Sequence, residues 1–118
     1  MDDGRPIFLQ IAALIERQII DGSLPEGEQV PSINEFAAFH RINPATALKG
    51  ITLLVDAGVL YKRRGIGMFV ADGARDRLIS DRRARFTTEY VQPLLAEGAA
   101  LGLGADALID LIRKESTS

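Results

Sequence analysis

Two helix-start signals stand close together in residues 32–44 and restrict what this part of the chain can form. Ser32 is followed three residues later by Glu35, the capping-box pattern in which each side chain accepts a hydrogen bond from the other residue's backbone N–H. Asn43 is a favoured cap residue, and Pro44 behind it suits the first helical position. Only a short helix and a tight turn fit between the two signals. The pattern therefore predicts a helix-turn-helix.

Helical periodicity extends this prediction on both sides. A helix between Pro6 and Gly22 is predicted by apolar residues at helical spacing: Ile7, Ile11, Leu14, Ile15 and Ile19. The helix that begins after Asn43 has a predicted buried side, formed by Ala47, Gly50, Ile51 and Leu54, and it ends near Gly58. Its opposite side carries Ala45, Leu48, Lys49 and Thr52.

A β-hairpin is predicted directly after the third helix. The β-prone runs VLYKR and MFVA are separated by RGIG, whose glycines allow a tight reversal. Three helices followed by a hairpin are the element order of a winged helix-turn-helix. We therefore expect a mostly helical α+β fold whose first domain covers residues 1–71.

Residues 72–118 are predicted to be helical again. A stripe recurs every four residues from Leu78 to Leu94, Pro93 should kink or end this helix, and a last helix starts near Ala105. Two short helices cannot enclose much apolar surface alone, so pairing with a second copy is expected, with an intrachain core as the alternative. The predicted dimer interface is Leu78, Arg82, Phe86, Tyr90, Leu94, Leu108, Leu111 and Ile112.

The net charge of −2 conceals a strong local imbalance. Residues 1–40 sum to −5 and residues 71–118 to −1, whereas residues 41–70 contain five basic side chains against one acidic, a sum of +4. Local charge decides which ligands a surface attracts. The positive segment coincides with the second helix of the helix-turn-helix and with the hairpin, which favours DNA as a partner.

The predicted DNA contacts follow from groove geometry. Small residues at the start of a helix allow close approach to base edges in the major groove, and a basic residue one turn later reaches a phosphate or a guanine. A hairpin tip with arginine and glycine suits the neighbouring minor groove. The predicted DNA-binding residues are Asn43, Ala45, Thr46, Leu48, Lys49, Arg63, Arg64, Gly65 and Gly67, and Asn34 joins them only through the family resemblance given below.

Several other functions find no support in the sequence. There is no cysteine and a single histidine, His40, and neither a nucleophile elbow nor a phosphate-binding loop occurs, so we expect no enzyme, metal or cofactor. No apolar run is long enough for a membrane span, and a cytoplasmic location is expected. The arginine-rich residues 75–85 also contain Asp76 and Asp81, which favours a salt-bridged helix surface over additional phosphate contacts.

The chain resembles the GntR family of bacterial transcription regulators from Pro6 to Val70. The motifs that carry the resemblance are GSLPEGEQVPS (22–32), NEFA (34–37), NPATALKG (43–50), LLVDAGVL (53–60) and RRGIGMFV (63–70). The remaining residues resemble the YtrA-like branch, whose short two-helix tail forms a homodimer. This resemblance implies a sequence-specific DNA-binding regulator, expected to be a repressor, that binds an inverted-repeat operator as a homodimer.

The family's DNA contacts match this sequence only in part. Thr46 stands where the family has a backbone-contacting threonine, and Gly65 matches the glycine of the wing tip. Asn34, Pro44 and Leu48 stand at positions that often carry arginine. Leu48 could instead pack against a thymine methyl group. A winged helix that binds protein rather than DNA is the alternative, and the operator, the target genes, any small-molecule effector and repression versus activation stay open.

Overall fold

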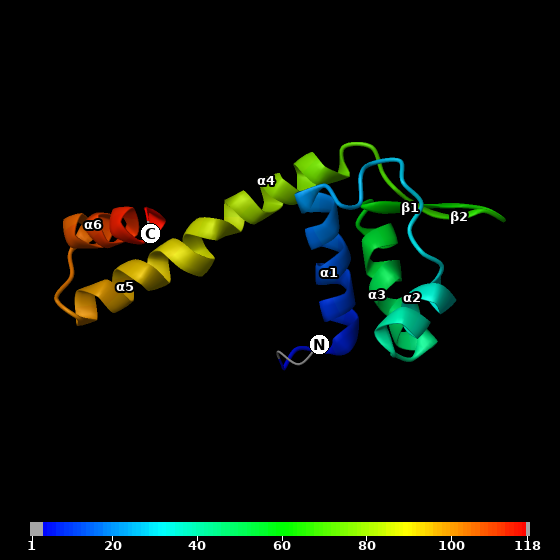
Figure 1. Ribbon diagram of the computed structural model, residues 1–118, viewed down its shortest axis with the longest axis horizontal. Coiled ribbons are helices and arrows are strands. Elements are labelled where there is room, and N and C mark those ends of the chain that lie inside the picture. Colours follow the sequence, from blue (N-terminus) through cyan, green and yellow to red (C-terminus); the bar gives the residue numbers. More distant parts are fainter. Residues whose placement is uncertain (1–3, 118) are drawn as a thin grey trace. The chain divides into compact units, whose positions relative to one another are not determined.

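The computed structural model describes residues 4–117, and residues 1–3 and 118 lie outside the described part (Figure 1). The chain divides into two compact units, residues 1–79 and residues 80–118. Its elements are α1 (Ile7–Asp21), α2 (Ile33–His40), α3 (Pro44–Asp56), β1 (Leu60–Arg63), β2 (Gly67–Val70), α4 (Ala74–Phe86), the π-helix η1 (Thr87–Val91), α5 (Gln92–Ala100) and α6 (Ala105–Ser116). The predicted mostly helical fold with a winged helix-turn-helix is confirmed.

Local hydrogen bonds set the two helix starts as predicted. The Ser32 hydroxyl accepts from the Glu35 N–H at 3.1 Å, and the Glu35 carboxylate accepts from the Ser32 N–H at 3.3 Å. The Asn43 side chain accepts from the Ala45 N–H at 2.8 Å, and Pro44 opens α3. Between them, Arg41 ends α2 in the left-handed region with φ 56°, which turns the chain sharply toward α3.

The hairpin forms the wing, and a third segment that the sequence did not predict pairs with it. Strands β1 and β2 pair antiparallel, and the Ile66 N–H donates to the Arg63 carbonyl across the turn at 2.9 Å. Gly65 has φ 76°, a conformation that disfavours residues with a Cβ. Residues 28–30 add along the other edge of β2, since the Val30 N–H donates to the Met68 carbonyl at 2.8 Å. The wing is therefore supported by the segment that precedes α2.

The core of the first unit confirms the predicted helix faces. Its fully buried large side chains are Ile11, Ile15, Ile19, Ile51, Leu60 and Val70. The predicted buried side of α3 is buried at every position. Gly50 lies so close to α1 that an added Cβ would be 2.7 Å from the Phe8 carbonyl oxygen. The absence of a side chain at this position lets the two helices pack closely.

Four hydrogen bonds attach the start of α4 to the rest of the first unit. The Glu26 carboxylate accepts from the backbone N–H groups of Gly73 and Arg75, at 2.9 and 3.1 Å. The Arg75 Nε donates to the Ile20 carbonyl at 2.9 Å, and the Arg77 guanidinium donates to the Gly58 carbonyl at 2.7 Å. Glu26 thus provides a helix cap from a distant segment, a role that local sequence signals do not reveal.

Replacing Glu26 should make the thermal stability of the protein depend less on pH in the acid range. The two backbone N–H donors stabilise the carboxylate and lower the pKa of Glu26 below its ordinary value of 4.5. A lowered folded-state pKa contributes stability above the unfolded-state value, and this contribution is lost as pH falls through the folded-state value. Glu26→Gln should therefore lower the thermal unfolding midpoint at pH 7, and the difference from wild type should close below about pH 4.

Thermal unfolding followed by circular dichroism at several pH values would measure this effect. Glu28→Gln is the matched control, because Glu28 is exposed and its carboxylate has no hydrogen bond within residues 4–117. The explanation fails if Glu26→Gln and Glu28→Gln have the same unfolding midpoint at pH 7.

The second unit contains the predicted interruption of the helix near Pro93. Regular α-helix ends at Phe86, the π-helix η1 follows, and α5 resumes with Pro93 in its first turn. Proline lacks the N–H that a continuous α-helix needs, and π-turns commonly accompany such breaks. Gly98 of α5 allows α6 to approach, since an added Cβ would lie 2.8 Å from Leu108 Cδ1. Within residues 4–117, no helix is both long and apolar enough to cross a membrane.

Two residues of the predicted dimer interface are placed differently by the structure. Leu78 is only 5% exposed and belongs to the core of the first unit, and Leu108 is 6% exposed beneath Gly98. Both side chains are already covered within the single chain, which leaves little of either to meet a partner, and their place in a dimer interface stays a prediction. Periodicity had identified them correctly as apolar positions but did not show what covers them.

Candidate nucleic-acid interface

The outer face of α3 is open to solvent in the first unit. Ala45, Lys49 and Thr52 are exposed, Leu48 is 45% exposed, and Thr46 is half-buried. The small residues Ala45 and Thr46 lie in the first turn, where a helix entering the major groove meets base edges. The predicted surface of this helix is therefore accessible to a ligand of the size of a DNA duplex.

Lys49 has a partner within the chain that the sequence did not predict. Its ammonium lies over the Phe8 ring of α1, 4.0 Å from the ring centroid. Cation–π contacts of this kind are worth about 0.5–1 kcal/mol at exposed sites. Lys49 is therefore held next to the beginning of α1, and reaching a phosphate or guanine would require it to leave or share this contact.

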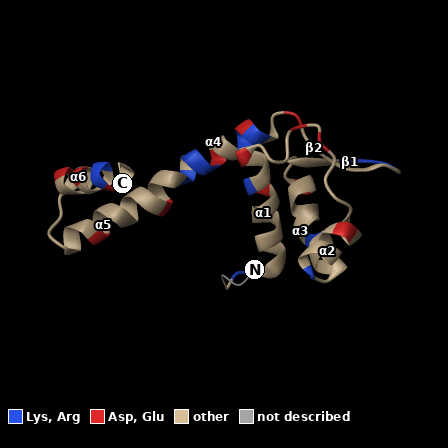
Figure 2. Ribbon diagram, viewed as in Figure 1, with Lys and Arg blue, Asp and Glu red and all other residues tan. Residues whose placement is uncertain are grey.

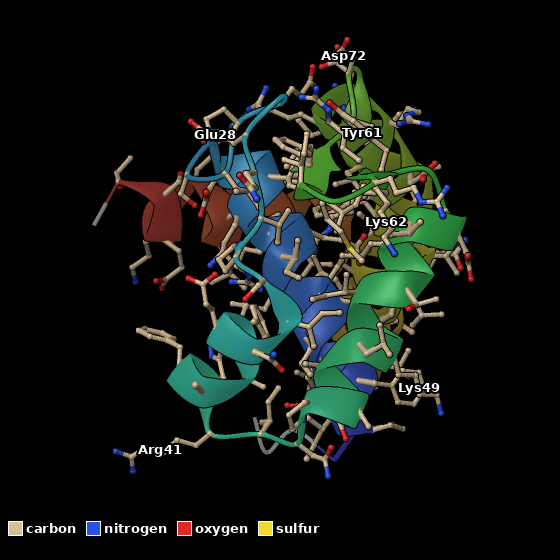
Figure 3. The ribbon with its side chains drawn as sticks, turned by 90° about the vertical axis from the view of Figure 1, so that its right-hand side faces the viewer. Glu28, Arg41, Lys49, Tyr61, Lys62 and Asp72 are labelled. Carbon is tan, nitrogen blue, oxygen red and sulfur yellow. The ribbon has the colours of Figure 1, made fainter. Side chains whose placement is uncertain are left out.

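The turn before α3 adds polar groups to the same end of the first unit. Asn34 is exposed on α2. The Asn43 Oδ1 is already occupied by the cap, which leaves the Nδ2 group of this side chain as its donor toward a ligand. Arg41 is exposed at the turn and was absent from the predicted contacts, although it contributed to the local charge. Figure 3 shows Arg41 and Lys49 at the end of the unit where α2 meets α3.

The wing carries its basic residues at and near the turn. Arg64 and Gly65 are exposed at the tip, and the Arg63 guanidinium lies 5.2 Å from the Phe69 ring centroid. Phe69 in turn stacks on Tyr61 with 5.8 Å between centroids. This contact occupies the Arg63 guanidinium within the chain, so Arg64, exposed at the tip, is the stronger candidate to enter a groove. Lys62, exposed on β1, also lies here and was not among the predicted contacts.

Gly67 has a structural role that the sequence did not show. The Gln29 Nε2 donates to the Ile66 carbonyl at 3.0 Å, and this side chain passes so close to Gly67 that an added Cβ would be 2.6 Å from it. Gly67 is half-buried rather than exposed. Gln29 thus braces the wing turn, and Gly67 makes room for it. A single glutamine in a turn-rich segment gives no sequence signal for such a contact.

Residues 41–70 carry five basic side chains against one acidic, as counted from the sequence. Figure 2 shows Lys and Arg at the turn between α2 and α3 and on β1 toward the wing tip, and also along α4, where acidic residues accompany them. The described residues 4–117 contain no cluster of His, Asp or Glu able to hold a metal ion. Positive charge and an exposed helix surface are therefore the chemical features that this face offers.

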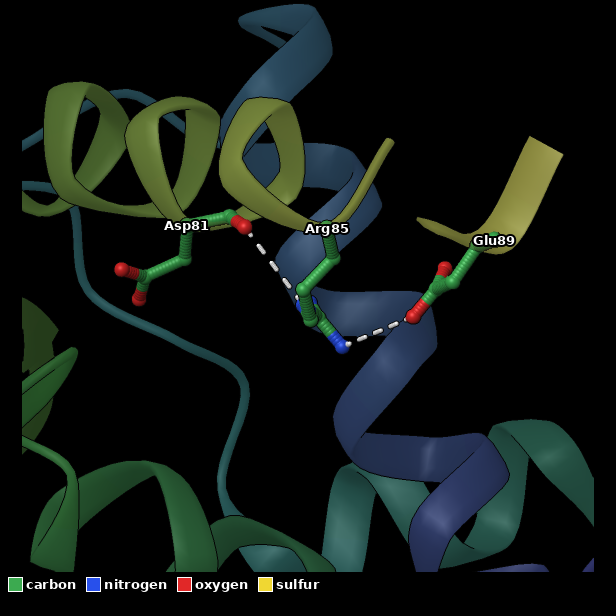
Figure 4. A network of polar contacts seen from close by, with 3 residues as sticks. All are labelled: Asp81, Arg85 and Glu89. Carbon is green, nitrogen blue, oxygen red and sulfur yellow. Dashed lines mark hydrogen bonds and ion pairs between the residues drawn. The ribbon is translucent and has the colours of Figure 1, made fainter. Parts of the chain in front are cut away.

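The arginine-rich helix α4 uses several of its guanidinium groups within the chain. Arg85 Nε donates to the Asp81 carbonyl at 3.4 Å, and its Nη1 lies 3.6 Å from the Glu89 carboxylate (Figure 4). Arg75 and Arg77 donate to backbone carbonyls of the first unit. Of these contacts, only the one with Glu89 is an ion pair of the kind expected for this helix, and the others go to backbone carbonyls. Arg82 is exposed.

The second unit exposes many large apolar side chains. Phe86 and Tyr90 are 55% and 63% exposed, and their ring centroids lie 5.4 Å apart. The other exposed large apolar residues of this unit are Leu94, Leu95, Leu101, Ile109, Leu111 and Ile112. Exposed apolar surface on a soluble protein often marks a site of contact with a partner. Of the predicted interface, Arg82, Phe86, Tyr90, Leu94, Leu111 and Ile112 are thus accessible to a partner.

A helix-turn-helix followed by a basic hairpin defines a winged-helix protein, and sequence comparison specifies the family. Residues 8–70 match the family described as "Bacterial regulatory proteins, gntR family". This match covers more than half of the chain, and the chain belongs to the GntR family of bacterial transcription regulators.

Relatives of similar length extend the likeness to the second unit. The HTH-type transcriptional regulator YhcF of Bacillus subtilis is 28% identical over 93% of this chain and 89% of its own length. The HTH-type transcriptional repressor YtrA of the same organism is 24% identical over 94% of this chain and 85% of its own. A GntR-family regulator from Bacteroides thetaiotaomicron superposes with a TM-score of 0.77 and 31% identity, covering 94% of this chain and 96% of that one. These matches support the YtrA-like assignment.

Proposed function

We propose that this GntR-family regulator binds an inverted-repeat operator as a homodimer and represses transcription in the bacterial cytoplasm. The observation that carries the proposal is the exposed outer face of α3, placed in one compact unit with a wing whose tip presents Arg64. A helix of this kind enters the major groove while the wing reaches the adjacent backbone or minor groove. The regulator is proposed to act through DNA occupancy rather than catalysis.

The proposal assigns DNA binding and dimerisation to the two predicted regions. Residues 1–71 bind one half-site, and residues 72–118 pair with a second copy. The compact units divide inside α4, after Ile79, so the first turns of this helix belong to the same unit as the winged helix. Exposed apolar residues around Phe86 and Tyr90 support pairing, because a two-fold dimer would remove them from water. The name of the relative YtrA supports repression.

The proposed docking face predicts a difference between Arg64 and Lys49. Each neutralised phosphate contributes a salt-dependent part of the affinity. Arg64→Ala should weaken operator binding about 10-fold per dimer, since each of two wings loses a contact of about 0.7 kcal/mol or more. Lys49→Ala should weaken it less, because part of the Lys49 interaction is already made with the Phe8 ring. Fluorescence anisotropy at several salt concentrations would measure both effects.

Lys114→Ala is a control that removes a positive charge from an exposed position on α6, outside the docking face. Arg64→Ala should also make the salt dependence shallower, whereas Lys114→Ala should leave it unchanged. Wild-type affinity in both Arg64→Ala and Lys49→Ala would reject this docking face. Exposed Leu48 and Ile66 would then favour a protein partner for the same surface.

A further inference from the structure

A pocket of about 350 Å³ opens in the first unit between α1 and α2. Pockets that hold small molecules have volumes of about 300–1,000 Å³. The residues that line it come from α1, the connecting segment and α2: Ile15, Gln18, Val30, Pro31, Glu35, Phe36, Phe39 and His40. None of them belongs to the predicted DNA contacts. The pocket is therefore a separate feature of the winged helix.

The floor of the pocket belongs to the hydrophobic core. Ile15, Val30 and Phe36 are each less than 5% exposed and pack within the core of the first unit. Residues held by such packing keep the cavity shaped before any ligand arrives. An apolar group that entered would contact this floor without rearranging it.

An aromatic wall lines the pocket along α2. The His40 ring lies 4.3 Å from the Phe36 ring and 4.9 Å from the Phe39 ring, measured between centroids. Phe39 is 82% exposed, the highest value among the exposed large apolar residues within residues 4–117. Its ring is therefore available to a ligand. The faces of such rings attract cations as well as apolar groups.

The polar groups that line the pocket favour a positive charge. Glu35 supplies a carboxylate, which the capping box holds in place through the Ser32 N–H. No lysine or arginine lines the cavity. Within residues 4–117, the Gln18 carboxamide has no hydrogen-bond partner, so it can meet a polar group of a ligand. The apolar floor, the aromatic rings and the single carboxylate together suit a compound that is both apolar and positively charged.

We propose that this pocket binds a small hydrophobic organic cation. Its apolar ring lies against Ile15 and Phe36, Phe39 covers it from the solvent side, and its cationic head lies near Glu35. A neutral molecule of the same shape would fill the floor without the attraction of the carboxylate and the ring faces. The charge of the ligand is therefore the property by which the pocket selects.

Binding here would bear on the regulation of DNA binding. The helix α2 precedes the turn that leads into α3 and packs against α3, so a change in the position of α2 would be felt by α3. A ligand between α1 and α2 would change the equilibrium only through different affinities for the two arrangements. This regulatory consequence rests on the proposed function, whereas the binding site itself does not.

Two probes that differ in charge but hardly in shape test the proposal without DNA. The cation 4-(hydroxymethyl)-N,N,N-trimethylanilinium and the neutral 4-tert-butylbenzyl alcohol, neither of which gains or loses a proton near neutral pH, would be titrated into the full-length, isotope-labelled protein at pH 8. Two-dimensional NMR should show saturable shifts of backbone amides in residues 15–18 and 30–40. The cation should bind about fivefold or more tightly than the neutral probe.

Two variants test separately the contributions of the Glu35 charge and of the Phe39 ring. Glu35→Gln retains an oxygen for the capping box but removes the charge, so it should abolish the preference for the cation. Phe39→Ala should weaken binding of the cation about threefold or more, with no loss of fold because the side chain is exposed. Asp56→Asn removes a carboxylate from the far end of α3 and should change nothing.

Three outcomes would overturn the proposal. The first is equal affinity for both probes, which removes the claim about charge. The second is a preference for the cation that survives in Glu35→Gln. The third is the absence of saturable shifts, or shifts that centre outside the pocket. Because DNA is not present, each outcome is independent of whether the protein regulates transcription.

Discussion

Tyr90→Asp should convert the proposed dimer into a folded monomer and weaken operator binding about 100-fold or more. Tyr90 lies on η1, is 63% exposed, and contacts the Phe86 ring among the exposed apolar residues of the second unit. Burying a carboxylate without a partner in a dimer interface costs several kcal/mol. A monomer loses the gain that comes from placing two half-site contacts on one duplex, which reaches factors of 10²–10⁴.

Sedimentation velocity would measure the oligomeric state, and fluorescence anisotropy would measure operator affinity. Thr88→Asp is the matched control, since Thr88 is exposed on the same π-helix and two residues away from Tyr90. Residues two apart on a helix do not share a face. A Tyr90→Asp protein that remains a dimer would contradict the proposed interface, whereas a monomer with wild-type affinity would contradict the need for two half-sites.

Gly50→Val should destabilise the fold by about 2–3 kcal/mol. An added Cβ at this position would be 2.7 Å from the Phe8 carbonyl oxygen and 3.0 Å from Cβ and Cγ2 of Ile11. The carbonyl is backbone and Ile11 is fully buried, so neither can move aside by a simple rotation. Valine recovers only about 0.5 kcal/mol through its better helix propensity than glycine. The overpacking between α1 and α3 therefore dominates.

Chemical denaturation would measure the loss of stability. Thr52→Val places the same side chain on the exposed side of α3 and should change the free energy of unfolding by less than about 0.5 kcal/mol. Gly50→Ala should fall between wild type and Gly50→Val. Equal stability of Gly50→Val and wild type would mean that α1 and α3 are not packed as closely as described.

Local chemistry explains which parts of the fold were predictable. Ser32 with Glu35 and Asn43 with Pro44 specify helix starts through hydrogen bonds and backbone geometry that involve only near neighbours. The buried face of α3 follows from apolar spacing, and the wing follows from two β-prone runs around glycines. These elements determine the fold, and each was correctly predicted.

Contacts between distant segments explain what the sequence did not reveal. The Glu26 carboxylate caps α4, and Gln29 braces the wing, although neither residue has a recognisable partner nearby in sequence. Periodicity marked Leu78 and Leu108 as apolar but could not distinguish their own chain from a partner as the covering surface. For the candidate site, local charge pointed to a region that the structure leaves exposed, while the Lys49 contact with Phe8 depends on the packing of α1 against α3.

The central claim is sequence-specific binding by a dimer, and selection of DNA tests it most directly. Purified protein would be mixed with genomic fragments of its source bacterium at near-physiological salt, and retained fragments would be sequenced. We expect enrichment of a few fragments that share one inverted repeat, with half-sites about one helical turn apart. Retention of fragments without a shared sequence, or of none, would contradict the claim.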